Sequence, residues 1–457
     1  MKFDMQKSFP SRVSVIGAAR SGLAAAEFFI NKGSEVFISD TCDVSKLETI
    51  LSRKGFAHIP HEAVAHTDKV FECDLIILSP GVPSDIPILV SARSRGIPVW
   101  SEMELGFRAC KATFLAVTGS TGKSTTVSLL GEALNAGGKN AVVAGNIGIP
   151  VISMVPQLPS GSFVVAEVSS FQLETVDQFR PLGAAVLNFM KNHLDRYSNE
   201  DDYYNAKKEI ARHFTKDNFL VLNANDQRLC DWAQEMKTRT QIIWFGADVK
   251  GEDSFWIDDS QIRYRFCGKS GVVLNVNDMV IKGHHNHENA CVASALAMVT
   301  GADIDGIAKG ICSFKGLKHR LEYVENVNNI KFYNDSKSTT AESILVAVQA
   351  FPKGVHLIAG GRDKFCDFTV VNDAIKNHVT DITLIGEAAD RMQNIWNGIV
   401  PIKRAATLDA AIDNAIENAD DGDVVVFSPG CSSFDMFKNY EERGDVFKEL
   451  VCKRKLK

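Results

Sequence analysis

A glycine-rich stretch in the first third of the chain has the residue types that bind nucleotide phosphates. The apolar run Phe114–Val117 predicts a strand, and Thr126–Leu134 predicts a helix. Between them, glycines let backbone N–H groups approach phosphate, and the start of the helix favours negative charge. A lysine can reach the β- and γ-phosphates, and the hydroxyl after it can bind Mg²⁺. We therefore expect a nucleotide to contact Gly119, Ser120, Thr121, Gly122, Lys123, Ser124 and Thr125.

An acidic residue lies where a second magnesium contact would be needed. The apolar run Phe163–Ala166 predicts another strand, and Glu167 follows it. The carboxyl end of a neighbouring parallel strand is where such a ligand belongs, and carboxylate oxygen suits Mg²⁺. Taken alone, Glu167 would more often be a surface acid, and the glycine-rich stretch would be an ordinary turn with an exposed lysine.

The elements that must position these residues alternate along the chain. Short runs rich in Val, Ile or Phe end in Gly, Ser, Asp or Glu and are followed by helix-like stretches, as in Val13–Ile16, Leu75–Leu78, Val355–Ala359 and Val424–Phe427. This is typical of buried parallel strands, so the predicted class is α/β. The length of 457 residues suggests three domains, which we place at residues 1–110, 111–314 and 315–457.

Composition excludes several classes of protein. The net charge of −6 gives no reason to expect a nucleic-acid partner. The ten cysteines form no Cys-x-x-Cys pair, which is typical of reduced thiols in a cytosolic protein. No signal peptide and no apolar run of membrane-spanning length is present, since Arg20 and Glu27 interrupt the first apolar stretch. We expect a cytoplasmic bacterial monomer that does not insert into membranes.

The N-terminal segment has a second glycine-containing turn. Gly17-Ala18-Ala19-Arg20-Ser21-Gly22 follows a predicted strand, and Asp40 ends the next one. This partly matches the dinucleotide-binding pattern, but Ala19 replaces the glycine that admits a pyrophosphate. An NAD-linked oxidoreductase would explain this segment, although it would leave the central glycine-rich stretch unexplained.

Six segments of the chain, which occur in the order that the family shows, resemble the Mur ligase family. They are Gly119–Ser124, Glu167–Glu174, Asn192–Tyr197, Tyr204–Lys208, Gly283–Asn289 and Gly316–Arg320. The resemblance implies a Rossmann-like N-terminal domain, a central ATP-binding domain with a parallel or mixed sheet, and a Rossmann-like C-terminal domain. It also implies ATP and Mg²⁺, with two metal sites, as cofactors.

Within the family, the C-terminal third resembles the members that add D-glutamate. Asn334–Thr339, Ala359–Lys364 and Ser428–Tyr440 carry this similarity, and the Asp-Asn-Pro-Arg of the diamino-acid-adding members is missing near Lys364. The resemblance implies that the substrates are UDP-N-acetylmuramoyl-L-alanine and D-glutamate, joined through an acyl phosphate during peptidoglycan precursor synthesis. D-Glutamate would contact Thr339, Lys364, Ser433 and Tyr440.

The resemblance also implies roles for the remaining candidate residues. The catalytic group would be Lys123, Asn146, His193 and Lys207. Mg²⁺ would be held by Ser124, Glu167, His193 and Lys207, the last as a carbamate. The nucleotide would also contact Asn286, Asn289, Arg320 and Asp335. The UDP end of the substrate would lie against Arg20, Ser21, Asp40, Thr41, Ser79 and Gly81.

Two kinds of alternative stay open on the sequence. A P-loop ATPase acting as a switch or motor would explain the central stretch but not the C-terminal segments. Within the family, the acceptor could instead be L-alanine, a diamino acid or L-glutamate. Lys208 is the natural control for Lys207, because the next residue of a helix points about 100° away.

Overall fold

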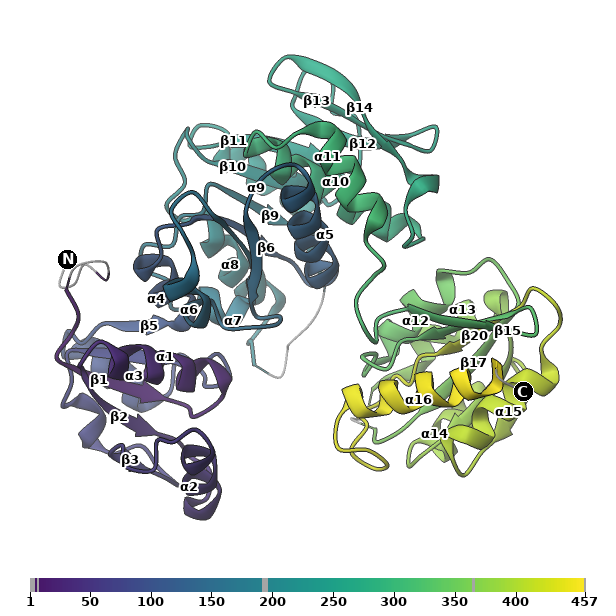
Figure 1. Ribbon diagram of the computed structural model, residues 1–457, viewed down its shortest axis with the longest axis horizontal. Helices are drawn as coiled ribbons and strands as arrows, with labels where there is room; N and C mark the ends of the chain where they lie inside the picture. Colours follow the sequence, from purple (N-terminus) through teal and green to yellow (C-terminus); the bar gives the residue numbers. More distant parts are fainter. Residues whose placement is uncertain (1–4, 6–7, 191–195, 364–365, 456–457) are drawn as a thin grey trace. The chain divides into compact units, whose positions relative to one another are not determined.

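The computed structural model describes Met5 and residues 8–190, 196–363 and 366–455. Two of the predicted site residues, His193 and Lys364, lie outside the described residues. The chain forms two compact units, of which the first comprises Met1–Met279 with His284–Phe314 and the second Val280–Gly283 with Lys315–Lys457. Three sheets with helices between their strands confirm the predicted α/β class (Figure 1).

The N-terminal sheet of the first unit is fully parallel. Its strand order is β3-β2-β1-β4-β5, with bounds His61–Glu62, Glu35–Ser39, Arg12–Ile16, Leu75–Leu78 and Val99–Ser101. The connecting helices are α1 (Arg20–Asn31), α2 (Val44–Arg53), α3 (Pro87–Ser94) and α4 (Glu102–Ala109). The order reverses at β1, and ligands of open parallel sheets bind beyond the carboxyl ends of the strands at such a point.

The central sheet of the first unit has nine strands in the order β14-β13-β12-β11-β10-β9-β6-β8-β7. The parallel part consists of β12 (Ser254–Asp258), β11 (Gln241–Phe245), β10 (Phe219–Asn223), β9 (Gly183–Val186), β6 (Thr113–Thr118), β8 (Phe163–Glu167) and β7 (Ala141–Gly145). An antiparallel ribbon of β13 (Gln261–Phe266) and β14 (Lys269–Asn275) extends it beyond β12.

Seven helices accompany this sheet in the described residues. They are α5 (Lys123–Ala136), α6 (Val151–Met154), α7 (Ser170–Leu173), α8 (Glu200–Lys208), α9 (Gln227–Met236), α10 (His284–Val299) and α11 (Ile304–Ser313). Helices α10 and α11 both pack against α5, the helix that follows the glycine-rich stretch (Figure 1). The loop is therefore backed by a buried helix.

Two buried carboxylates join the N-terminal sheet to the central part of the first unit. Glu104, at the start of α4, accepts hydrogen bonds from the backbone N–H groups of Asp177, Gln178 and Phe179 at 2.9–3.0 Å. Glu102 accepts one from the Ile152 N–H at 2.7 Å. These contacts satisfy the N–H groups of the buried Phe179 and Ile152, which would otherwise lack partners.

The second unit is built on a sheet in the order β15-β16-β20-β17-β18-β19. The bounds are Glu322–Val327, Ile330–Asn334, Val424–Phe427, Val355–Gly360, Val379–Ile385 and Ile402–Arg404, and only the β15–β16 pair is antiparallel. Its helices are α12 (Ala341–Gln349), α13 (Asn372–His378), α14 (Ala389–Trp396), α15 (Leu408–Asn418) and α16 (Tyr440–Lys455). Across the described residues of both units, no helix combines the length and apolarity needed to cross a membrane.

Candidate active site

The glycine-rich stretch forms a loop between β6 and α5. Gly122 has a φ of 83°, and a Cβ added to it would lie 2.7 Å from Asn289 Oδ1, so this position requires glycine. Asn289 Oδ1 also accepts a hydrogen bond from the Thr126 hydroxyl at 3.0 Å. Asn289 therefore braces the loop from α10, and Asn286 lies three residues earlier on the same helix, as predicted.

The backbone of this loop has a partner that no local sequence pattern predicts. Asn188 Oδ1 accepts hydrogen bonds from the N–H groups of Ser120 and Thr121, both at 3.0 Å. These are N–H groups of the kind that would bind phosphate oxygens. The only sequence signal was a polar residue just after β9, the strand beside β6.

Three neighbouring strands bring the predicted magnesium and phosphate residues together. In the order β6-β8-β7, Val117 and Gly145 both pair with Glu167. The Glu167 carboxylate accepts hydrogen bonds from the Ser124 hydroxyl and the Asn146 side-chain amide, both at 2.7 Å. It is 3% exposed. Sequence reasoning had placed these three residues in one site, and the structure places their side chains in contact.

Two lysines converge on the carbonyl group of Gly119. Lys123 Nζ donates to the carbonyl oxygens of Gly119 at 2.8 Å and Ser120 at 3.0 Å. Lys207 Nζ, from the last turn of α8, donates to the Gly119 carbonyl at 3.0 Å and lies 4.5 Å from the Tyr203 ring centroid. Lys207 is 2% exposed, whereas Lys208 is turned toward the Trp232 ring of α9. The two neighbouring lysines therefore face different surroundings.

The environment of Lys207 disfavours its charged form. Burial lowers the pKa of Lys207 to about 6, the nearby Lys123 cation lowers it as well, and Glu167 opposes both effects. In a large fraction of molecules the Lys207 amine is therefore neutral at pH 7. A neutral amine is a nucleophile, which an ammonium group is not.

The donor set at the loop fits a hard divalent cation. Glu167 and Ser124 present oxygen atoms, and oxygen is the ligand that Mg²⁺ prefers. Within the described ranges, no cluster of three His, Cys, Asp or Glu side chains could hold a metal ion. A magnesium site here would therefore rely on Ser124, Glu167 and other oxygen donors.

The turn after β1 borders a cavity at the point where the strand order reverses. The cavity measures about 400 Å³ and is lined by Gly17, Asp40, Thr41, Gly81 and Pro83, among others. Both oxygens of Asp40 accept backbone hydrogen bonds, from Ala18 at 2.7 Å and from Cys42 at 2.8 Å. Burial raises the pKa of Asp40, but these N–H groups outweigh it and hold the net pKa below the usual value. Asp40 thus fastens the turn as an anion.

The remaining predicted residues of this region differ in exposure. Arg20 and Thr41 are exposed, and Ser21 is half-buried. Ser79 is 1% exposed, and its hydroxyl donates to the Gly17 carbonyl at 3.0 Å. The Ser79 side chain therefore braces the turn and does not face the cavity surface.

A second cavity, of about 620 Å³, shares Gly81 and Pro83 with the first and is also lined by Phe171, Glu174 and Arg196. Arg196 donates to the carbonyl oxygens of Pro80 at 3.2 Å and Val82 at 3.4 Å, and to Glu174 at 3.0 Å. No role for Arg196 follows from the sequence motifs. It ties the turn after β4 to the α7 segment that follows Glu167.

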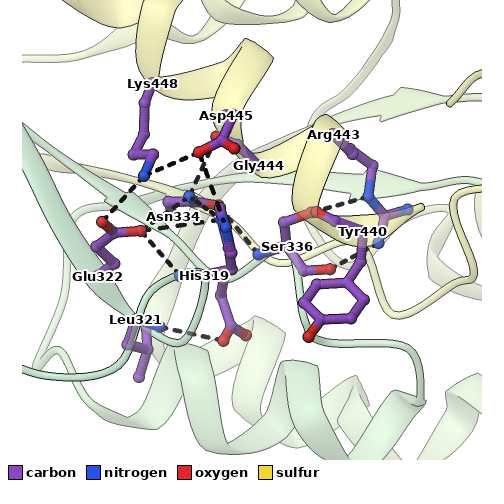
Figure 2. Close-up of polar contacts among 11 residues, drawn as sticks. His319, Leu321, Glu322, Asn334, Ser336, Tyr440, Arg443, Gly444, Asp445 and Lys448 are labelled. Carbon is purple, nitrogen blue, oxygen red and sulfur yellow. Dashed lines mark hydrogen bonds and ion pairs between the residues drawn. The ribbon is translucent and has the colours of Figure 1, made fainter. Parts of the chain in front are cut away.

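The second unit holds the other predicted residues. Asp335, directly after β16, accepts hydrogen bonds from the Ser428 hydroxyl at 2.8 Å and the Leu321 N–H at 3.2 Å. Burial raises the pKa of Asp335 to about 7, and the hydrogen bond from Ser428 and the charge of Arg320 oppose this rise. The turn that carries Arg320 is anchored by His319, whose N–H donates to Glu322 at 2.8 Å (Figure 2).

The predicted acceptor residues lie on loops at one end of this sheet. Thr339 follows β16, Ser433 follows β20, and Tyr440 begins α16. Ser433 is buried, while Thr339 and Tyr440 are half-buried. β16 and β17 both pair in parallel with β20, so their carboxyl ends and the loops after them share one edge.

Comparisons with known proteins cover almost the whole chain. Residues 11–101 match the Mur ligase MurD-like N-terminal domain, residues 117–297 the Mur ligase middle domain, and residues 319–431 the Mur ligase, glutamate ligase domain. A UDP-N-acetylmuramoylalanine–D-glutamate ligase of Koribacter versatilis is 39% identical over 97% of both chains. One of the same name from Acidobacterium capsulatum is 39% identical over 96% of both.

Solved structures show the same fold. UDP-N-acetylmuramate-alanine ligase MurC of Thermotoga maritima has a TM-score of 0.60 at 18% identity, covering 97% of this chain and 100% of its own. MurF ligase of the same organism, in complex with ADP, has a TM-score of 0.61 at 15% identity, covering 98% and 97%. Because relatives are 39% identical over nearly their whole length, the chain belongs to the Mur ligase family and is an ATP-dependent ligase that forms carbon–nitrogen bonds.

Proposed function

We propose that this ligase joins D-glutamate to UDP-N-acetylmuramoyl-L-alanine, with ATP converted to ADP and phosphate, in the synthesis of peptidoglycan precursors. The observation that carries this proposal is the 39% identity, over 97% of both chains, to a relative named for that reaction. The grouping of Lys123, Ser124, Asn146 and Glu167 around one loop supports it.

The chemistry needs an activated carboxylate, because joining a carboxylate to an amine in water is uphill. The substrate carboxylate attacks the γ-phosphorus of ATP, and ADP leaves. The amine of D-glutamate then attacks the acyl carbon, and phosphate leaves. The protein mainly positions the reactants and neutralises charge. Lys123 binds phosphate oxygens in place of its present loop carbonyls, and Asn146 hydrogen-bonds near the transferred phosphate.

The residues that would hold Mg²⁺ are Ser124 and Glu167, joined by His193 and by Lys207 as a carbamate. Bound Mg²⁺ supplies positive charge against the phosphate oxygens. The burial of Lys207 beside Lys123 supports the modification, because addition of CO₂ converts an amine in a cation-rich site into an anion. Glu167 has neutral hydrogen-bond partners in Ser124 and Asn146, which leaves its negative charge for a cation.

The two cavities of the first unit suit an elongated nucleotide-sugar substrate. Asp40 and Thr41 would lie near the uracil, with Arg20 and Ser21 at the diphosphate. The second cavity continues from the first at Gly81 and would take the sugar and its peptide. Ser79 would act through the Gly17 turn.

The second unit carries the remaining predicted binding residues. Arg320 and Asp335 would contact ATP. Thr339, Lys364, Ser433 and Tyr440 would bind D-glutamate, whose two carboxylates need a cation and hydroxyl donors.

An acceptor panel tests the proposal. The purified enzyme is given ATP, Mg²⁺ and UDP-N-acetylmuramoyl-L-alanine with D-glutamate, L-glutamate, L-alanine or a diamino acid, and phosphate release is measured. We expect release with D-glutamate and little with the others. Lys123→Ala should abolish it, since such a transition-state contact contributes on the order of 3 kcal/mol or more. Equal rates with all acceptors would refute the D-glutamate assignment and favour another family activity.

A further inference from the structure

Arg443 is a buried cation in the first turn of α16. It is 1% exposed, and its Nε donates to the Ser336 hydroxyl oxygen at 3.0 Å. Its Nη2 donates to the carbonyl oxygen of Ser336 at 2.8 Å (Figure 2). The same nitrogen donates to the carbonyl oxygen of Cys431 at 3.1 Å. Nη1 has no hydrogen-bond acceptor among the described residues. The hydrogen-bond acceptors of this guanidinium group among the described residues are neutral oxygens, and the nearby charges of Asp435 and Asp335 offset its burial only in part, so this position needs a reason beyond packing.

The bonded segments are loops at the carboxyl ends of adjacent strands. Ser336 follows β16 and Cys431 follows β20. Gly361, at the end of β17, also lies close, because a Cβ added there would be 3.1 Å from Arg443 Nη1. Arg362 and Ser432 exchange backbone hydrogen bonds at 2.9 and 3.0 Å. One guanidinium group therefore lies where the loops after all three strands meet.

These loops carry the proposed acceptor residues. Thr339 follows Ser336 by three residues, Ser433 follows Cys431 by two, and Tyr440 lies one helical turn before Arg443. The Ser336 hydroxyl donates to the Tyr440 carbonyl at 2.8 Å, so the start of α16 is tied to the β16 loop as well. Because Arg443 is buried, it does not itself form the surface that an acceptor would touch.

We propose that Arg443 is the positioning residue for the amino-acid acceptor, holding the loops after β16 and β20 and the start of α16 in the register that the acceptor's carboxylates require. This inference rests on the proposed function for the identity of the acceptor. The planar guanidinium group reaches two carbonyls and a hydroxyl at once, and a lysine ammonium on a flexible stem does not hold that geometry.

The test compares Arg443→Lys and Ser336→Ala with a control on the same helix. Arg454 lies eleven residues later, about 16 Å along the axis, and pairs with Asp409 and Asp413 on α15. Arg454→Lys therefore matches the chemistry of the change without touching the loops. Melting temperature, kcat and the KM of each substrate are measured for all three variants of the full chain.

For Arg443→Lys we expect KM for D-glutamate to rise about tenfold or more, because the loops shift and the residues that they carry no longer contact the acceptor in the right geometry. The KM for UDP-N-acetylmuramoyl-L-alanine should stay near that of the wild type. At saturating D-glutamate, kcat should largely recover, which a partly unfolded protein would not show. Ser336→Ala should shift the same KM by a smaller factor, and Arg454→Lys should leave it unchanged.

An unchanged KM for D-glutamate in Arg443→Lys would overturn the proposal. So would a fall in kcat at saturation that follows the melting temperature, since that is the signature of a structural role alone. Should Arg443→Lys fail to fold, Ser336→Ala decides in the same way. If the wild-type enzyme does not use D-glutamate as its acceptor, the proposed function is refuted instead. The variants are then measured with the acceptor that the wild type uses.

Discussion

Arg196 offers the most direct test of how the two cavities of the first unit are held in shape. Its guanidinium group lies 4.1 Å from the Phe171 ring centroid, donates to two carbonyls of the turn after β4, and pairs with Glu174. Arg196 and Glu174 side chains are 15% and 14% exposed, so solvent screens this cluster only partly. Gly81, in the same turn, lines both cavities.

Arg196→Lys would keep the charge but lose most of the other contacts. The two carbonyl contacts are long, at 3.2 and 3.4 Å, so each contributes about 0.5 kcal/mol, at the lower end for hydrogen bonds. The contact with the ring adds about 0.5–1 kcal/mol. The sum of about 1.5–2 kcal/mol corresponds to a rise of about 10- to 30-fold in KM for UDP-N-acetylmuramoyl-L-alanine, because a relaxed turn must be reordered on binding.

The control is Arg95→Lys, since Arg95 lies 3.9 Å from the Phe71 ring centroid and 3.6 Å from Asp68 without touching this turn. Steady-state KM values for the nucleotide sugar, ATP and D-glutamate should show a change only for the nucleotide sugar, and only in Arg196→Lys. The change in binding free energy, taken from the KM ratio for the nucleotide sugar, should be smaller in the double variant Arg196→Lys/Glu174→Gln than the sum for the two single variants, because both substitutions break the same network. The reasoning fails if KM for ATP rises by the same factor or if KM for the nucleotide sugar is unchanged.

Lys207→Ala should be nearly inactive and partly rescued by a small carboxylic acid, which supplies an anion beside Mg²⁺, whereas Lys208→Ala should release phosphate at close to the wild-type rate because Lys208 faces Trp232. An unmodified mass for Lys207 in fully active, bicarbonate-treated enzyme would contradict the carbamate. His356→Gln should destabilise the second unit. Burial lowers the pKa of His356, but hydrogen bonds at 2.9 and 3.0 Å to Asp381 and Asp423 outweigh it and raise the net pKa. The stabilisation by His356 should therefore be complete below about pH 6.5 and diminish as pH rises through the folded-state pKa. Denaturant titrations measure the free energy of unfolding of the wild type and of His356→Gln. An equal difference between the two at pH 5.5 and pH 8.5 would refute this prediction.

Local patterns were enough to predict the class of fold and the strands beside the phosphate loop. The apolar runs Phe114–Val117 and Phe163–Ala166 both form strands, because fully buried parallel strands need uninterrupted apolar residues. The loop between β6 and α5 was also predictable, because the strand, the glycines and the helix after them follow one another within a few positions. Only Glu167 was predicted at the carboxyl end of a strand, and its contacts with Ser124 and Asn146 depend on β6, β8 and β7 lying side by side.

Residues that act through tertiary contacts left no such local pattern. Asn188 bonds the phosphate loop across about 70 positions of sequence, and only the β9–β6 pairing places it there. Arg443 is an arginine in a helix whose neighbours include glutamates and lysines, and nothing in that pattern predicts a fully buried side chain. Its burial depends on strands β16, β17 and β20 ending side by side, which is a property of strand order. Residues for substrate binding could therefore be proposed from sequence motifs, whereas the residues that hold those motifs in place could be found only from the topology of the sheets.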